Sequence, residues 1–237
     1  MNANHPQPRT EFDWAIYADA TLAGLSVLIP IPFIDSFFES FFRKRIPASI
    51  VRRRGVEVSR PVLDALRHEP FSLGGCLRSS ILWPFKATWD LIKRLSKKFL
   101  YFLTIKEATD QVSHYWHRAF LIDYILLVGH HKSVESAKLA QRALSETLAT
   151  TTTSPLLQLA QQIVFGTNHV FRLLRRAKKG SEDEELQKQK AEMRQHWADF
   201  SPYFKTLANR YDEIYARLAE EQRQAERQQQ QLQEQRQ

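Results

Sequence analysis

Residues 25–47 read LSVLIPIPFIDSFFESFFRKRIP and decide how the N-terminal part of the chain folds. Proline lacks an amide donor, so Pro30 and Pro32 break the apolar helix that precedes them. After this corner, large apolar side chains recur in adjacent pairs every four residues, which places them on one helical face. These side chains are Phe33, Ile34, Phe37, Phe38, Phe41 and Phe42. The pattern predicts a helical hairpin whose second arm is amphipathic and ends near Pro47, or restarts there.

Two interpretations of this apolar face are open. Large side chains on one helical face most often pack in a protein core, and core packing is the interpretation that we favour. The alternative is insertion into a membrane interface, because aromatic residues followed by a basic helix end are also typical of helices that lie on lipid. The apolar anchor would then consist of Phe33, Phe37, Phe38, Phe41 and Phe42.

The positive charge of the chain is concentrated in one region. The 237 residues carry a net charge of +8, while residues 43–98 alone hold 14 Lys and Arg against four Asp and Glu. Overlapping the end of this region, residues 84–103 form a second basic amphipathic pattern. Such an excess indicates an acidic partner such as anionic lipid, nucleic acid or an acidic protein, or else a solvated basic surface. The candidate anion-binding residues are Arg43, Lys44, Arg45, Arg52, Arg53, Arg54, Lys93, Arg94, Lys97 and Lys98.

Most of the remaining chain is typical of α-helix. Helix starts are predicted by capping residues and helix ends by glycine. These signals are Thr10, Gly55, Ser133, Ser154 with Pro155, Ser181 with Glu184, and Ser201 with Pro202. We therefore predict an all-α bundle of about eight helices with a long C-terminal helix. Its expected parts are a disordered N-terminus at residues 1–9, a helical body at 10–180 and a C-terminal extension at 181–237.

The C-terminal extension carries an apolar heptad pattern. One seam position is occupied by Phe204, Tyr211, Leu218, Ala225 and Leu232. Leu207 and Ile214 fill the second position, where Glu221 and Gln228 then follow. The front half can pack on the body or on a partner helix. Residues 222–237 contain nine Gln in 16 residues, so this end is predicted to be a frayed helix or a partner-dependent coiled coil.

No motif for catalysis or for a cofactor is visible. The chain lacks a Gly-rich phosphate loop and a nucleophile elbow, and its one cysteine, Cys76, fits a reducing compartment. Glu107, Asp110, His114 and His117 share a helical face, but the paired Glu-x-x-His spacing of a dimetal bundle is missing. We expect no catalytic residue, no metal, no cofactor and no enzymatic activity.

Residues 24–55 suggest a family. Their apolar helix, the Pro-x-Pro-apolar-x-Asp corner at Pro30, Pro32 and Asp35, and the helix that follows resemble EcsC-like and related GTPase-associated helical domains. The resemblance covers 32 of the 237 residues. It implies an all-helical domain linked to membranes, and it carries no catalytic residue and no GTPase domain into this chain.

These observations lead to a functional prediction. We expect a cytoplasmic protein that associates peripherally with an anionic membrane surface through basic amphipathic helices, at the inner face of a membrane. The longest uncharged stretches fall short of the roughly 20 apolar residues that span a bilayer, and prolines or an acid interrupt them. The alternative is a helical scaffold that uses Phe204, Leu207, Tyr211, Ile214 and Leu218 as a partner helix, with possible self-association. Nucleic-acid binding is a third option, disfavoured because the aromatic residues follow the apolar helical faces.

Overall fold

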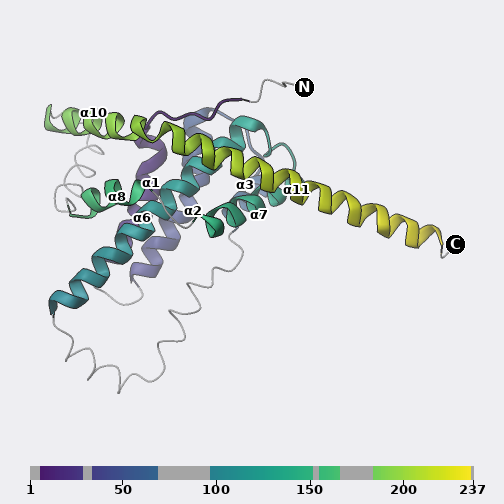
Figure 1. Cartoon of the computed structure of the whole chain (residues 1–237), viewed down its shortest axis with the longest axis horizontal. Coiled ribbons are helices and arrows are strands. Elements are labelled where there is room, and N and C mark those ends of the chain that lie inside the picture. The colour runs from purple at the N-terminus through teal and green to yellow at the C-terminus, as the bar shows by residue number, and fades with distance from the viewer. Residues whose placement is uncertain (1–5, 29–33, 69–96, 152–154, 166–183, 236–237) are drawn as a thin grey trace, which may run out of the picture.

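The chain folds into a helical bundle around one long central helix. The computed structural model describes residues 6–28, 34–68, 97–151, 155–165 and 184–235. These residues form eight α-helices, one short 3-10 helix and no strand, which confirms the predicted all-α class (Figure 1). The helices are α1 (Trp14–Leu25), α2 (Ile34–Arg54), α3 (Arg60–Arg67), α6 (Lys97–Val128), α7 (Val134–Thr150), α8 (Leu156–Phe165), α10 (Glu184–Asp199) and α11 (Ser201–Glu234), with η1 at Ser26–Leu28.

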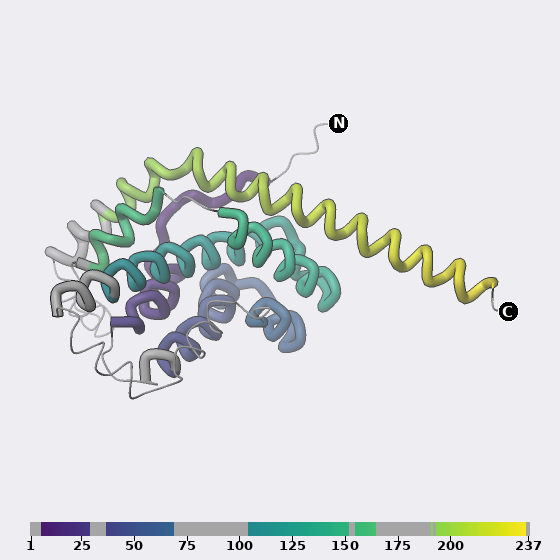
Figure 2. Tube along the Cα trace, turned by 60° about the horizontal axis from the view of Figure 1, so that its bottom comes forward, coloured from purple at the N-terminus to yellow at the C-terminus, as the bar shows by residue number. Residues whose placement is uncertain are grey.

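Helix α6 is the centre of the bundle. Every residue from 115 to 126 is buried, as expected for a helix that is hydrophobic on most of its sides. Helices α1, α2, α7 and α8 pack around α6, while α3 and α11 lie against α7. Helix α10 leads into α11, which crosses the body and then runs on past it (Figures 1 and 2). The helices around the centre therefore pack one face against α6 or α7 and turn another face to the surface.

The N-terminal segment is held against the bundle, and α1 starts later than Thr10 predicts. Its N-cap is Asp13, whose carboxylate accepts a hydrogen bond from the Ala15 amide at 2.9 Å. The Arg9 guanidinium lies 3.4 Å from the Asp123 carboxylate of α6, so order extends into the segment for which disorder is predicted. Thr10 instead accepts a hydrogen bond from the Ser201 hydroxyl, at 3.3 Å.

Helix α2 is longer than the sequence predicts. Pro47 neither ends it nor starts a new helix, and the helix continues to Arg54. The neighbouring Ile46 and Ile50 are fully buried, and the packing of these side chains outweighs the hydrogen bond that proline removes. Gly55 then ends α2 as predicted, with a positive φ of 64° and the Val56 amide bonded back to the Val51 carbonyl.

The crossing of α1 and α6 requires a glycine at position 24. A Cβ atom there would lie 2.5 Å from the Val112 backbone, closer than two carbon atoms can approach. Gly24→Ala should therefore lower the free energy of unfolding by about 2–3 kcal/mol, measured by urea titration with circular dichroism. Gly55→Asn is the control, because Asn tolerates positive φ and open space surrounds Gly55, and its change should stay within about 0.5 kcal/mol. Equal losses in both variants would contradict the close crossing.

Candidate functional site

The first half of α2 turns its apolar face away from the protein. Phe37, Phe38 and Phe41 are 68%, 38% and 45% exposed, and only Phe42 packs against the core. The expectation of core packing is therefore wrong for the first three side chains. The opposite, polar face of the helix meets the protein instead, since the Glu39 carboxylate accepts a hydrogen bond from the Tyr115 hydroxyl of α6 at 2.6 Å.

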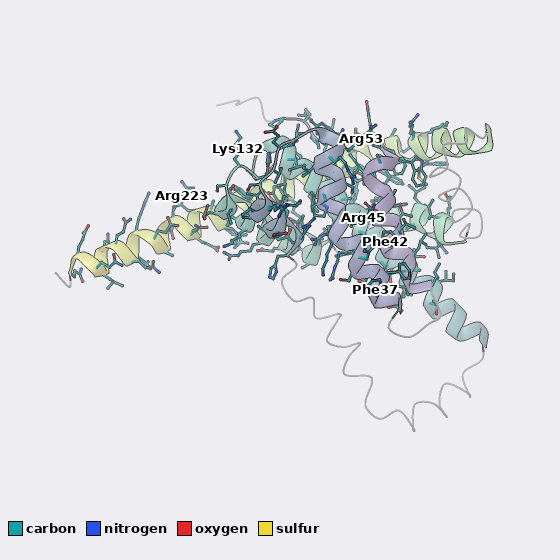
Figure 3. The ribbon with its side chains drawn as sticks, turned by 180° about the vertical axis from the view of Figure 1, so that it is seen from behind. Phe37, Phe42, Arg45, Arg53, Lys132 and Arg223 are labelled. Carbon is teal, nitrogen blue, oxygen red and sulfur yellow. The ribbon has the colours of Figure 1, made fainter. Side chains whose placement is uncertain are left out.

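Basic side chains continue this exposed apolar face along the helix. Positions 37, 41, 44, 48 and 52 are three or four residues apart and so form one line on the helix surface. Lys44 and Arg52 on this line are exposed. Beside the line, the Arg45 guanidinium carbon lies 5.3 Å from the centre of the Phe41 ring. Figure 3 shows Phe37 and Arg45 along the same helix. We name this surface the α2 stripe, and it consists of Phe37, Phe38, Phe41, Lys44, Arg45 and Arg52.

Other arginines of the basic cluster are used by the fold. Arg54 donates two hydrogen bonds of 2.7 Å to the Asp123 carboxylate, and this bonding raises the pKa of Arg54. Arg53 lies 2.6 Å from the carboxylate of Asp13. These pairs compete with any anionic partner, although the Arg53 side chain stays exposed, so the assignment of both arginines as anion-binding residues stays a prediction. Their role is to fix α2 against α6 and the start of α1.

The remaining cations of the cluster differ in how far they are engaged. Arg45 is also within 3.5 Å of the Asp19 carboxylate, an ion pair whose arginine side stays about half exposed. Arg43 is half-buried. Among the described residues, Lys44 and Arg52 form no ion pair. Lys44 and Arg52 are therefore the cations most available to a partner.

Several predicted site residues cannot be placed on this surface. Phe33, Lys93 and Arg94 lie outside the described residues. Lys97 and Lys98 begin α6, and their side chains are not described. Of the predicted site residues, the structure therefore brings together on one surface those of the α2 stripe.

The predicted partner-helix seam of α11 divides into two parts. Its front half is buried on the body, mainly against α7, through Phe204, Leu207, Tyr211, Ile214 and Leu218. From residue 221 to 235 every side chain is exposed, including Leu232 at 56%. The heptad allows the front half to pack either on the body or on a partner helix, and in the structure it packs on the body.

On the polar face of α6, His117 is engaged by neighbouring groups. Asp110, His114 and His117 do line one small pocket of about 170 Å³. However, His117 donates from Nδ1 to the Ser113 carbonyl at 2.5 Å, so its Nε2 accepts from the Tyr203 hydroxyl at 2.6 Å. Burial lowers the pKa of His117 to about 4, so the ring is neutral and both its nitrogens are occupied. No cluster of three metal-ligating side chains occurs in the described part of the chain.

Asp123 is a structural residue whose importance the sequence understates. In the sequence it is a single acid inside an apolar helix, and in the structure it receives hydrogen bonds from Arg54 and Arg9. The signal for this role was the acid itself, because a buried carboxylate requires a cationic partner. Its partners could not be read from the pattern, since they come from distant parts of the chain.

The site and fold together define an all-α bundle with an exposed aromatic and basic helix stripe. Comparison of the chain with family models, with characterised proteins and with solved structures finds no match. Among the described helices, none is long and apolar enough to cross a membrane.

Proposed function

We propose that the protein binds peripherally to anionic membranes through the α2 stripe. The observation that carries the proposal is the outward orientation of Phe37, Phe38 and Phe41 on a helix that continues into Lys44, Arg45 and Arg52. Exposed aromatic residues next to cations are complementary to a bilayer surface, where rings enter the acyl boundary and cations meet the headgroups. The resemblance of residues 24–55 to EcsC-like domains also implies a link to membranes, and it remains a prediction.

Both halves of the stripe are needed for useful affinity. Each cation near an anionic surface contributes about 1 kcal/mol, so Lys44, Arg45 and Arg52 supply about 3 kcal/mol together. Full burial of one Phe side chain adds about 1.5–3 kcal/mol, and the exposed rings recover part of this. Phe37 is the most exposed of the three and should contribute most. We therefore expect moderate membrane binding that requires anionic lipid and weakens as the salt concentration rises.

Removing the apolar half should reduce membrane binding. In co-flotation with vesicles of phosphatidylserine and phosphatidylcholine, Phe37→Ser with Phe41→Ser should raise the apparent Kd at least about tenfold. Gln230→Ser with Gln233→Ser is the control, because both residues are exposed and lie on the outer face of the distant end of α11. Absence of wild-type binding, or equal binding by the two variants, would contradict the proposal.

Reversing the charge should reveal the electrostatic half in the same assay. Lys44→Glu with Arg52→Glu should abolish flotation with the anionic vesicles. Lys138→Glu with Arg142→Glu, two exposed positions of α7, makes the same charge change away from the stripe and should retain most of the binding. Binding that survives in the first variant, or that is equally strong on pure phosphatidylcholine, would exclude the electrostatic mechanism.

Nucleic acid is the rival partner for an aromatic and basic surface. Binding of single strands combines ring stacking with a row of cations that follows the backbone. The three exposed rings are grouped at one end of the α2 stripe and the cations follow them, which favours an interface with an apolar inner layer and a charged outer one. Fluorescence anisotropy with an oligo-dT probe distinguishes the two, and tight binding that competes with vesicles would overturn the lipid assignment.

A scaffold role is the second candidate function, and one observation favours it. Helix α11 extends beyond the body with residues 221–235 exposed. A projecting helix of this kind presents a surface to another protein whether or not the α2 stripe binds lipid.

A further inference from the structure

The far end of α11 is a helix without a partner in the described part of the chain. Its last buried residue is Leu218, and the helix continues to Glu234 (Figures 1 and 2). At a rise of about 1.5 Å per residue, the stretch after Leu218 projects by about 24 Å. A short isolated helix is only marginally stable in water, so this stretch gains from a second helix.

Neutral and charged side chains of this stretch lie on different faces. In the register set by Leu218, the inward and flanking heptad positions are those that face a partner helix. From residue 222 to 235 these positions hold only neutral side chains, namely Gln222, Gln224, Ala225, Gln228, Gln229, Gln231, Leu232 and Gln235, and the next flanking position in the sequence is Arg236. The charged residues Arg223, Glu226, Arg227 and Glu234 occupy the opposite face. We name the neutral side the glutamine face.

Glu221 is the one acid in a seam position, and an arginine one turn earlier in α11 pairs with it. Its carboxylate lies 2.6 Å from the guanidinium of Arg217, which also pairs with Glu146 of α7. Further on, Arg223 pairs with Glu220 at 3.0 Å, and Gln222 donates to Glu226 at 2.9 Å. These contacts support the helix, with Gln222 reaching from the glutamine face to Glu226, and they leave the seam at Ala225 and Leu232 free of charge.

A second copy of this chain is the partner that this surface fits best. A glutamine amide both donates and accepts hydrogen bonds, so a row of amides is complementary to an identical row. In a two-fold pair the same patch occurs on both subunits, and the absence of charge removes like-charge repulsion between them. This face offers no opposite charge to an acidic or basic partner. To a strongly apolar partner it offers contact only at Ala225 and Leu232.

We propose that residues 222–235 pair with the same segment of a second copy in a short two-stranded coiled coil. Ala225 and Leu232 form its apolar centre, and glutamine side chains bond across it. With so little apolar surface the pair is a reversible dimer that forms as protein concentration rises. The dimer goes beyond the proposed membrane function, because it forms without lipid. Two α2 stripes on one particle would also increase the avidity for a membrane.

The experiment is sedimentation equilibrium of the full-length protein over a range of concentrations, without lipid. Gln228→Glu with Gln229→Glu places two negative charges on the glutamine face. Gln230→Glu with Gln233→Glu places the same two charges on the outer face. All four residues are exposed, so neither variant disturbs the body, and circular dichroism verifies the helix content.

The expected result is a concentration-dependent dimer for the wild type and for the outer variant. The inner variant should raise the dimer Kd at least about tenfold, because like charges then face each other across the seam. A wild type that stays monomeric at every concentration overturns the proposal. A dimer that both variants weaken equally, or that neither weakens, also overturns it, since the contact would then lie elsewhere. Flotation is a separate assay, so failure of this proposal leaves the membrane proposal standing, and the reverse also holds.

Discussion

Replacing Trp197 by alanine should lower the free energy of unfolding by about 4 kcal/mol, because this replacement leaves a large cavity at the junction of four chain segments. Trp197 of α10 is fully buried. Its ring centre lies 4.9 Å from that of Phe12, 4.5 Å from Tyr17, 5.5 Å from Trp116 and 4.8 Å from Phe204. Through these rings α10 is joined to α1, α6 and α11.

The loss at Trp197 should come from packing alone. The indole Nε1 is buried and has no hydrogen-bond partner in the structure, so alanine removes no hydrogen bond. Trp197→Phe keeps most of the ring volume and removes the unpaired donor, and its cost should stay within about 1.5 kcal/mol. Urea unfolding followed by far-UV circular dichroism measures both variants, and the alanine variant should shift the midpoint by about 1–2 M.

A second tryptophan of the same cluster provides the control. Trp14 touches the edge of Phe12 at 5.1 Å but is only half-buried. Trp14→Ala should therefore cost roughly half as much as Trp197→Ala, or less. Equal losses would show that the cluster does not depend on the central position of Trp197.

The sequence predicts the helices of this protein better than it predicts their surroundings. Local signals were sufficient for the all-α class and for boundaries such as Ser133, whose hydroxyl accepts from the Ser136 amide, and Gly55. Pro47 misleads, because its cost is local while the burial of the neighbouring Ile46 and Ile50 depends on tertiary structure. Helix periodicity can be read from the local sequence, whereas the place where α2 ends depends on tertiary packing.

The candidate site shows the same division. Periodicity identifies the phenylalanine face of α2 but does not determine whether that face meets α6 or solvent. The Glu39 hydrogen bond to Tyr115, 76 residues away, turns the polar face inward. In the same way, one run of three arginines contains Arg52, which forms no ion pair with the described residues, and Arg53 and Arg54, which pair with Asp13 and Asp123. Only the distant carboxylates distinguish them.

Removing the charge of Asp123 should destabilise the bundle by about 3 kcal/mol, since Arg54 then loses its counter-ion in a largely buried place. Asp123 is buried, while the Arg54 side chain is 22% exposed, which keeps the loss at the lower end of what broken buried pairs cost. In Asp123→Asn, the side-chain oxygen can still accept one hydrogen bond from Arg54. The new amide NH2 group then faces the second guanidinium donor, and two donors repel each other. Urea unfolding measures the loss.

Two further variants separate the charge effect from a general effect of substitution. Asp64→Asn breaks the exposed pair with Arg67, in which Asp64 is 67% exposed, and should cost less than about 0.5 kcal/mol. Arg54→Met with Asp123→Leu replaces the pair by apolar side chains and should recover most of the stability, because no buried charge remains unpaired. Arg9, about two-fifths exposed, then returns to water. A double variant no more stable than Asp123→Asn would mean that the ion pair itself, and not the avoidance of an unpaired charge, stabilises the junction of α2 with α6.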